Sequence, residues 1–185
     1  MEGFRTVSED RLEQDVRGEI EPALAAMGYA LVELSVGRRK GVTHVVVVLH
    51  RPGGVGVDQC AEVARAIQPR LELVEGLSDV TLEVSSPGIE RTIKDPAEYG
   101  IFRGRGVRVL PAEGGEWIGG VIEAFRDGTL VLRTPEGARE FPPGAVRRAR
   151  LDYRLDPAGP EGRGGRPQPR PPIERMDSGE RSHAV

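Results

Sequence analysis

The sequence predicts an α+β protein, in which an α-β-β-α-β unit is followed by a small all-β barrel. Helical and strand periodicities alternate through the first 90 residues, which is typical of helices packed on one sheet. Five short alternating segments, separated by glycine-containing turns, follow up to residue 155. The remaining residues are rich in Pro, Gly and Arg. The predicted boundaries are therefore 1–90 for the first domain, 91–155 for the second and 156–185 for a disordered tail.

The first helix and the first strand are predicted from their periodicities. The helix has one apolar stripe at steps of three and four: Leu12, Val16, Ile20, Leu24 and Met27. Gly28 ends it, because glycine readily takes a positive φ just after a helix. Tyr29–Val36 alternates as a strand, which predicts one face made of Ala30, Val32, Leu34 and Val36. The segment Gly37-Arg38-Arg39-Lys40-Gly41 indicates a hairpin turn.

The rest of the first domain is predicted to add two strands and a helix. Val42–His50 contains an unbroken run of valines, which favours a central strand covered on both faces. Asp58 is the predicted N-cap of a second helix, whose apolar face carries Cys60, Val63, Ala64, Ile67 and Leu71. Val80, Leu82 and Val84 mark a third strand. Two helices then cover one face of a three-stranded sheet.

The second domain is predicted to be built from short strands. Asp95-Pro96 opens a short helix before them, with Asp as N-cap and Pro in the first turn. The five strands are expected at residues 107–110, 117–125, 129–133, 139–141 and 146–151. Asp127-Gly128 and Glu136-Gly137 predict tight hairpins between them. This pattern indicates a barrel of the SH3-like or Sm-like kind, whose closure removes exposed strand edges.

Composition and hydropathy indicate in which cellular compartment the protein works. The single cysteine, Cys60, excludes an internal disulfide and a multi-cysteine zinc site. The first ten residues lack the apolar core of a signal peptide. The longest aliphatic run, Val45–Leu49, is far shorter than the ~20 residues that span a bilayer. We therefore expect a cytoplasmic protein without a membrane partner.

Charge is distributed unevenly along the chain. Residues 1–99 carry 11 cationic and 17 anionic side chains, whereas residues 100–155 carry 10 and 7. An acidic first half and a basic second half suggest two surfaces with different partners. A pure nucleic-acid binder would be basic throughout.

Sequence signatures of catalysis are missing. No P-loop, dinucleotide-binding GxGxxG, HExxH or GxSxG motif occurs. His44 and His50 are expected ~20 Å apart along one strand, too far to share a metal. The sequence therefore predicts a protein that is not an enzyme and that uses no metal, cofactor or small-molecule substrate.

Two groups of cations are candidate binding residues. Arg38, Arg39 and Lys40 lie at the predicted hairpin tip, and Arg103 and Arg105 at the start of the second domain, with Arg147 and Arg148 in its last strand. Such side chains can contact phosphates without reading a base sequence. A solvated turn and a generic basic rim remain the competing interpretations. Trp117, Phe125 and Phe141 are predicted to belong to the barrel core rather than to an exposed stacking platform.

The third candidate is the segment Ser85-Ser86-Pro87-Gly88-Ile89-Glu90-Arg91. Pro87-Gly88 has the residue types of a type II turn. The two hydroxyls and Arg91 could gather an anion or fix the neighbouring chain. A structural turn between the two domains is the interpretation that the residues favour.

The stretch LEVSSPGIER, Leu82 to Arg91, resembles the signature of the bacterial ribosome maturation factor RimP family. The resemblance runs from about Leu12 to Leu155 and includes MGYALVELSV, VDQCAEVARAI and WIGGVIEAF. It implies a KH-like first domain and an SH3-like or Sm-like second domain. It also implies a monomer that binds the immature small ribosomal subunit in the cytoplasm, through ribosomal RNA or a ribosomal protein, without catalysis. A general RNA-binding adaptor with an Sm-like barrel is the alternative function.

Overall fold

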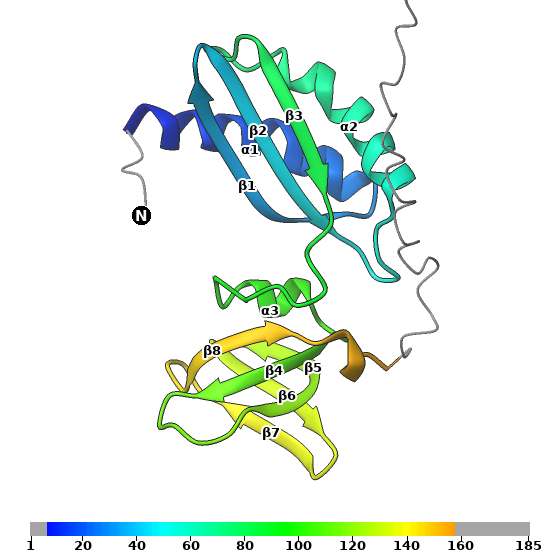
Figure 1. The fold of residues 1–185 in the computed structure, drawn as a ribbon, viewed down its shortest axis with the longest axis vertical. Coiled ribbons are helices and arrows are strands. Elements are labelled where there is room, and N and C mark those ends of the chain that lie inside the picture. Colours follow the sequence, from blue (N-terminus) through cyan, green and yellow to red (C-terminus); the bar gives the residue numbers. More distant parts are fainter. Residues whose placement is uncertain (1–6, 158–185) are drawn as a thin grey trace, which may run out of the picture.

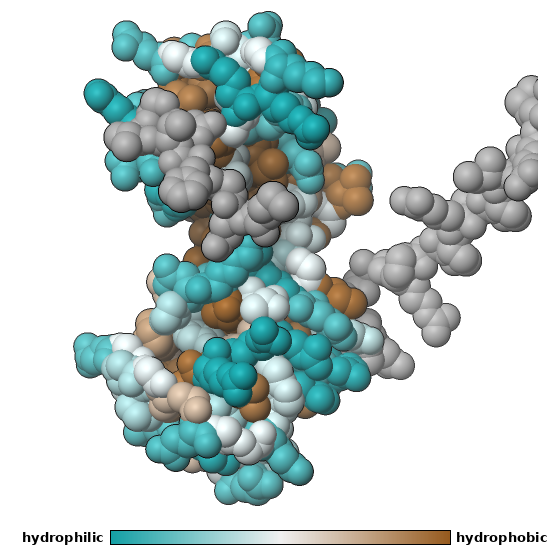
Figure 2. All heavy atoms as spheres, turned by 60° about the vertical axis from the view of Figure 1, so that its left-hand side comes forward, coloured by the Kyte–Doolittle hydropathy of each residue, from teal (hydrophilic) through white to brown (hydrophobic). Residues whose placement is uncertain are grey.

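The computed structural model describes residues 7–157 and contains two separate sheets, each with its own hydrophobic core (Figure 1). We call residues 7–90 the α/β unit and residues 91–157 the β unit. The predicted disordered tail, 156–185, lies outside the described residues except for its first two. Hydrophilic residues cover most of the face shown in Figure 2, and hydrophobic residues appear there in small patches.

The α/β unit has the predicted order of elements. It consists of α1 (Val7–Ala26), β1 (Ala30–Arg39), β2 (Val42–His50), α2 (Val57–Leu71) and β3 (Val80–Ser85). β2 is the central strand, antiparallel to β1 and parallel to β3. Both helices cover the same face of the sheet (Figure 1). Their apolar stripes supply the core from α1 (Val16, Ile20, Leu24) and from α2 (Val63, Ile67, Leu71).

The prediction that β2 is covered on both faces is wrong. Val45 and Val47 are fully buried towards the helices, whereas Val46 and Val48 are only half-buried. Because α1 and α2 pack on one face, the other face of the sheet has no helical layer. At its His50 end this open face instead meets the β unit, where the His50 and Phe102 rings lie 5.1 Å apart between centroids.

The predicted alternation of β1 is interrupted at Val32. The pairing with β2 shifts between Leu31 and Glu33, so Val32 is the extra residue of a β-bulge. Leu31, Leu34 and Val36 therefore lie in the core of the α/β unit, and Ala30 and Val32 do not. Val32 packs instead against the core of the β unit.

The turns of the α/β unit differ in detail from the prediction. Gly28 has φ +79° and follows α1, as expected. The hairpin is tighter than predicted, because only Lys40 and Gly41 form the turn, both with positive φ. The N-cap of α2 is Gly56 rather than Asp58: the Gln59 side chain accepts a hydrogen bond from the Gly56 amide, and Asp58 lies in the first turn.

The β unit has the five predicted strands. After the short helix α3 (Glu98–Ile101) come β4 (Gly106–Pro111), β5 (Ile118–Arg126), β6 (Thr129–Thr134), β7 (Gly137–Phe141) and β8 (Val146–Leu151). A 3-10 turn, η1 (Tyr153–Leu155), follows. The prediction that Asp95 is the N-cap of this helix is wrong, because α3 begins later and its N-cap is Ala97. The Asp95 carboxylate accepts a hydrogen bond from the Ala97 amide at 2.8 Å in the turn before the helix. Asp127 and Gly128 both take positive φ in the β5–β6 hairpin, as Asp-Gly predicts.

The five strands form one antiparallel sheet in the order β7-β6-β5-β4-β8. The sheet is strongly curved, with β8 beside α3 and β7 at the far end (Figure 1). Its core contains Tyr99, Phe102, Val107, Ile122, Leu132, Phe141 and Leu151 among its buried residues. Within the described residues no ladder joins β7 to β8.

Candidate functional site

The segment Ser85–Arg91 leads from one unit to the other. Ser85 is the last residue of β3, and Ser86, Pro87 and Gly88 continue without regular structure. The turn lies later than predicted, since the Arg91 amide donates to the Gly88 carbonyl at 3.1 Å and Ile89 and Glu90 form the corner. Gly88 does not have the positive φ that a type II turn requires at that position, so the predicted turn type is wrong.

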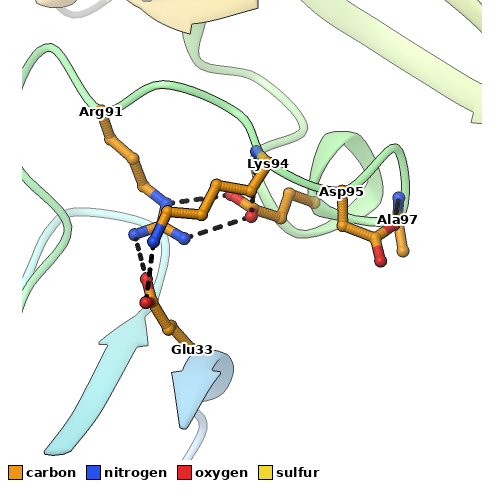
Figure 3. Close-up of polar contacts among 6 residues, drawn as sticks. Glu33, Arg91, Lys94, Asp95 and Ala97 are labelled. Carbon is orange, nitrogen blue, oxygen red and sulfur yellow. Dashed lines mark hydrogen bonds and ion pairs between the residues drawn. The ribbon is translucent and has the colours of Figure 1, made fainter. Parts of the chain in front are cut away.

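Arg91 is the central side chain of the junction between the units. Its Nε and Nη2 donate to the two carboxylate oxygens of Glu98, at 2.9 and 3.1 Å, and its Nη1 donates to Glu33 at 2.8 Å. Only 10% of the Arg91 side chain and 6% of the Glu98 side chain are exposed. Figure 3 shows Arg91 reaching from the linker towards Glu33 on β1. We call this pair of contacts the Arg91 clamp.

Lys94 strengthens the same junction. Its Nζ donates to the second oxygen of Glu33 at 2.8 Å, so both oxygens of that carboxylate have a cationic partner (Figure 3). The hydrogen bond from Lys94 lowers the pKa of Glu33 below its usual value, and Arg91 lowers the pKa further, while partial burial opposes both. Burial and the charge of Glu98 raise the pKa of Tyr99 to about 12.

The backbone of Arg91 to Ile93 is hydrogen-bonded to β8 of the β unit. The Leu151 amide donates to the Arg91 carbonyl at 2.8 Å, and the Ile93 amide donates to the Ala149 carbonyl at 2.9 Å. Arg91 to Ile93 therefore run along β8 as a short extra strand, with Thr92 paired to Arg150. Since the Arg91 side chain contacts Glu33 while its backbone is held by β8, one residue connects the two units.

The predicted cations at the hairpin do not form one cluster. Arg38 and Arg39 lie in β1 rather than in the turn, so they point to opposite faces of the sheet. Arg38 Nη2 donates to the Gly76 carbonyl at 2.8 Å. Arg39 and Lys40 are exposed, and neither forms an ion pair within residues 7–157.

The predicted cations of the β unit fall into two groups. Arg105 donates to both carboxylate oxygens of Asp156, at 3.0 and 3.1 Å, and is mostly buried, so it holds the end of the unit together. Arg103 is exposed and donates to the Glu123 carbonyl. Arg147 and Arg148 are exposed on β8 and form no ion pair among the described residues.

Arg147 and Arg148 also line a hollow of about 320 Å³ beside the junction. Lys94 lines the same hollow, and 62% of its side chain is exposed. Phe125 and Pro143 contribute apolar surface to it, and Asp95 is the acidic residue of its lining. This cationic hollow, defined by Lys94, Arg147 and Arg148, is the strongest candidate contact surface for a phosphate backbone.

The prediction that three aromatic residues belong to the barrel core is confirmed for Phe125 and Phe141 and is wrong for Trp117. Phe141 is buried in the core of the β unit, and Phe125 packs against that core. Trp117 lies outside the core and is 37% exposed. The Arg150 guanidinium lies over its ring, 5.3 Å from the centroid. The sequence signal was the position of Trp117 directly after Gly114-Gly115-Glu116, in the loop that ends just before β5.

Two further searches concern metals and membranes. Within residues 7–157, no group of three His, Cys, Asp or Glu side chains is arranged to hold a metal ion. Of the described helices, none is long and apolar enough to cross a membrane.

Comparison with protein families bears on the first of the two units. Residues 19–90 match the family model described as the RimP N-terminal domain. The matched range includes the C-terminal part of α1, the whole three-stranded sheet, α2 and the segment Ser85–Gly88, and it ends immediately before Arg91. It lies within the span over which the sequence resembles RimP proteins. Residues 19–90 of the chain are therefore similar to the N-terminal domain of RimP proteins.

Proposed function

We propose that this protein binds the immature small ribosomal subunit in the cytoplasm and assists its assembly as a monomer, without catalysis. The observation that carries the proposal is the RimP N-terminal domain at residues 19–90. We also infer that the α/β unit is KH-like and that the β unit is an SH3-like or Sm-like barrel. The order α-β-β-α-β and the curved five-stranded sheet support these assignments.

The surface that we assign to ribosomal RNA is the cationic hollow of Lys94, Arg147 and Arg148. Arg147 and Arg148 have no carboxylate partner among the described residues, so they are available to neutralise phosphates, and each such contact releases counterions. Lys94 is already paired with Glu33, so it contributes less to this contact. Arg103, Arg39 and Lys40 are exposed but do not line this hollow, so any phosphate that they bind is a separate contact. Arg91 and Arg105 are engaged within the chain, so we assign them to holding the fold rather than to binding.

The Arg91 clamp gives the two units a defined relative position. The acidic α/β unit and the basic β unit can then contact different components of the subunit at once, such as a basic ribosomal protein and a stretch of RNA. A factor of this kind acts by binding, and its effect depends on the geometry between its two surfaces.

The test is co-sedimentation with immature small subunits from cells that lack the gene. The double charge reversal R147E/R148E removes two proposed phosphate contacts, so binding weakens and the slope of log affinity against log salt falls by about 2. R65E/R70E is the matched control, because Arg65 and Arg70 are exposed on α2 and the change in net charge is the same. Equal binding by the two variants would contradict the assigned surface.

A second experiment separates this function from that of a general RNA-binding adaptor. Wild-type protein is offered an excess of free duplex and single-stranded RNA in competition with immature subunits. A maturation factor stays with the subunits, and a general adaptor is displaced by the free RNA. Unchanged small-subunit levels after gene deletion, together with no co-sedimentation, would refute the proposed function.

A further inference from the structure

Trp117 is the exposed aromatic of the β unit. Tyr99, Phe102 and Phe141 are buried in the core of that unit, but more than a third of Trp117 is accessible. The guanidinium of Arg150 covers part of the indole ring at 5.3 Å. Such a stack holds the ring in a fixed orientation at modest energetic gain. An exposed, oriented indole is a surface on which a flat ligand can stack.

Trp117 lines a hollow of about 830 Å³ in the β unit. This volume is within the range of about 300–1,000 Å³ that is usual for small-ligand sites. It is large enough for a nucleobase with its sugar, but not for a helix or a duplex. The hollow lies between the start of β5 and the β6–β7 turn.

Two glycines of β5 line this hollow. A Cβ atom at Gly119 would lie 3.0 Å from Leu155 Cδ1, and one at Gly120 would lie 3.0 Å from the Arg133 carbonyl oxygen. Both distances are shorter than ordinary van der Waals contacts. Glycine at these two positions therefore lets the Leu155 side chain and the backbone of β6 pack closely against β5, and Leu155 is itself part of the lining.

The charges around the hollow balance. Arg133 and Arg139 line it, and Glu116 and Glu136 line it as well. A ligand held mainly through phosphates would meet as many anions as cations here. A neutral, planar face is better matched to this lining than a phosphate is, and stacking on an aromatic ring is how proteins bind unpaired bases.

We propose that the hollow beside Trp117 binds one unpaired base of single-stranded RNA. The base stacks on the indole, and Arg150 orients the indole. The proposal rests on the proposed function in one respect, which is that the RNA belongs to the maturing subunit. It adds a second RNA contact that differs in chemistry from the cationic hollow of Lys94, Arg147 and Arg148.

The chain contains a single tryptophan, so its fluorescence reports on this site alone. The full-length protein is titrated with single-stranded octamers of uridine and of adenosine, and with a duplex of equal length. Saturable quenching by the single strands, and none by the duplex, is the expected result. An extended acidic peptide serves as the competing ligand class. Quenching by the peptide or by the duplex to the same extent as by the single strands would overturn the proposal.

Variants then measure what the ring contributes. Trp117→Leu is expected to weaken binding of a labelled octamer roughly 5- to 150-fold, which corresponds to the usual worth of one base–aromatic stack. Trp117→Phe retains most of the affinity, because a smaller aromatic face remains. Ile89→Ala is the control, since Ile89 is an exposed apolar residue outside the hollow. Circular dichroism establishes that each variant is folded. Equal affinity of Trp117→Leu and wild type would overturn the proposal.

The two RNA contacts fail in distinguishable ways. Stacking depends weakly on salt, whereas phosphate contacts depend steeply on it. Weaker octamer binding by Trp117→Leu, with an unchanged slope of log affinity against log salt, supports the stacking site. If R147E/R148E abolishes binding to subunits while Trp117→Leu leaves octamer binding intact, the stacking site is refuted and the proposed function stands. If wild-type protein binds octamers through Trp117 but never sediments with immature subunits, the proposed function is refuted and the stacking site stands.

Discussion

Replacing Arg91 by alanine tests whether the junction is held by a buried ion pair. The substitution leaves the Glu98 carboxylate, which is 6% exposed, without its bidentate partner. One hydrogen bond remains, from the Lys94 amide at 3.3 Å. Removing one partner of a buried pair typically costs 3–5 kcal/mol because the other charge stays buried. With the remaining hydrogen bond, we expect the free energy of unfolding to fall by about 3 kcal/mol.

Removing the charge of Glu33, the other carboxylate that Arg91 contacts, should lower the free energy of unfolding much less than removing Arg91. A third of the Glu33 side chain is exposed, so its ion pairs are screened by solvent. Glu33→Gln should therefore lower the free energy of unfolding by less than about 1 kcal/mol. It should nevertheless loosen the contact between the units, because both cations that reach β1 end on this one carboxylate.

Urea denaturation followed by far-ultraviolet circular dichroism and by Trp117 fluorescence measures both effects, since Trp117 reports on the β unit. Small-angle X-ray scattering measures the relative position of the units. The double variant R91M/E98L removes both charges of the buried pair, so it should be more stable than Arg91→Ala alone. The reasoning is refuted if Arg91→Ala costs less than 1 kcal/mol, or if R91M/E98L is destabilised by the sum of its single substitutions.

Gly106→Ala should destabilise the β unit by more than about 2 kcal/mol, because the new Cβ would lie 2.4 Å from the Asp152 carbonyl oxygen and 2.7 Å from Leu155. Thermal unfolding measures this loss of stability. A melting temperature equal to that of the wild type would contradict the prediction. The pKa of Glu33 is lowered in the folded protein, so its contribution to stability is present above pH 4.5 and is lost as the pH falls through the lowered pKa. Carboxyl NMR titration should show Glu33 ionising below 4.5, and Lys94→Ala should move that pKa upward; an unchanged pKa in Lys94→Ala would show that Lys94 is not its main cause.

The order of elements could be predicted because it depends on local patterns. The stripe from Val16 to Leu24 has helical spacing, and Asp127-Gly128 has the backbone preference of a two-residue hairpin. Each of these signals involves residues within a few positions of one another. They identified all eight strands and the two long helices of residues 7–157.

The features that were missed depend on residues far apart in the chain. Arg91 and Glu33 are 58 positions apart, and nothing near either residue indicates the other as its partner. Arg105 and Asp156 are 51 positions apart, so a cation that looked available for binding is engaged with a carboxylate from the predicted tail. The basic patches were therefore predicted with too many members, because a sequence counts charges without showing which of them are paired.

The β-bulge at Val32 and the Arg91 clamp together determine how the two units are held against each other. An exposed ion pair is worth little, so Arg91 and Glu33 could not hold two units together on a hydrated surface. The bulge turns Leu31 into the core of the α/β unit and leaves Val32 beside Glu33, where it packs on the core of the β unit. The tilted rings of His50 and Phe102 make a second contact between the units, 5.1 Å apart between centroids. Packing thus supplies the affinity between the units, and the directional hydrogen bonds of Arg91 select a single orientation.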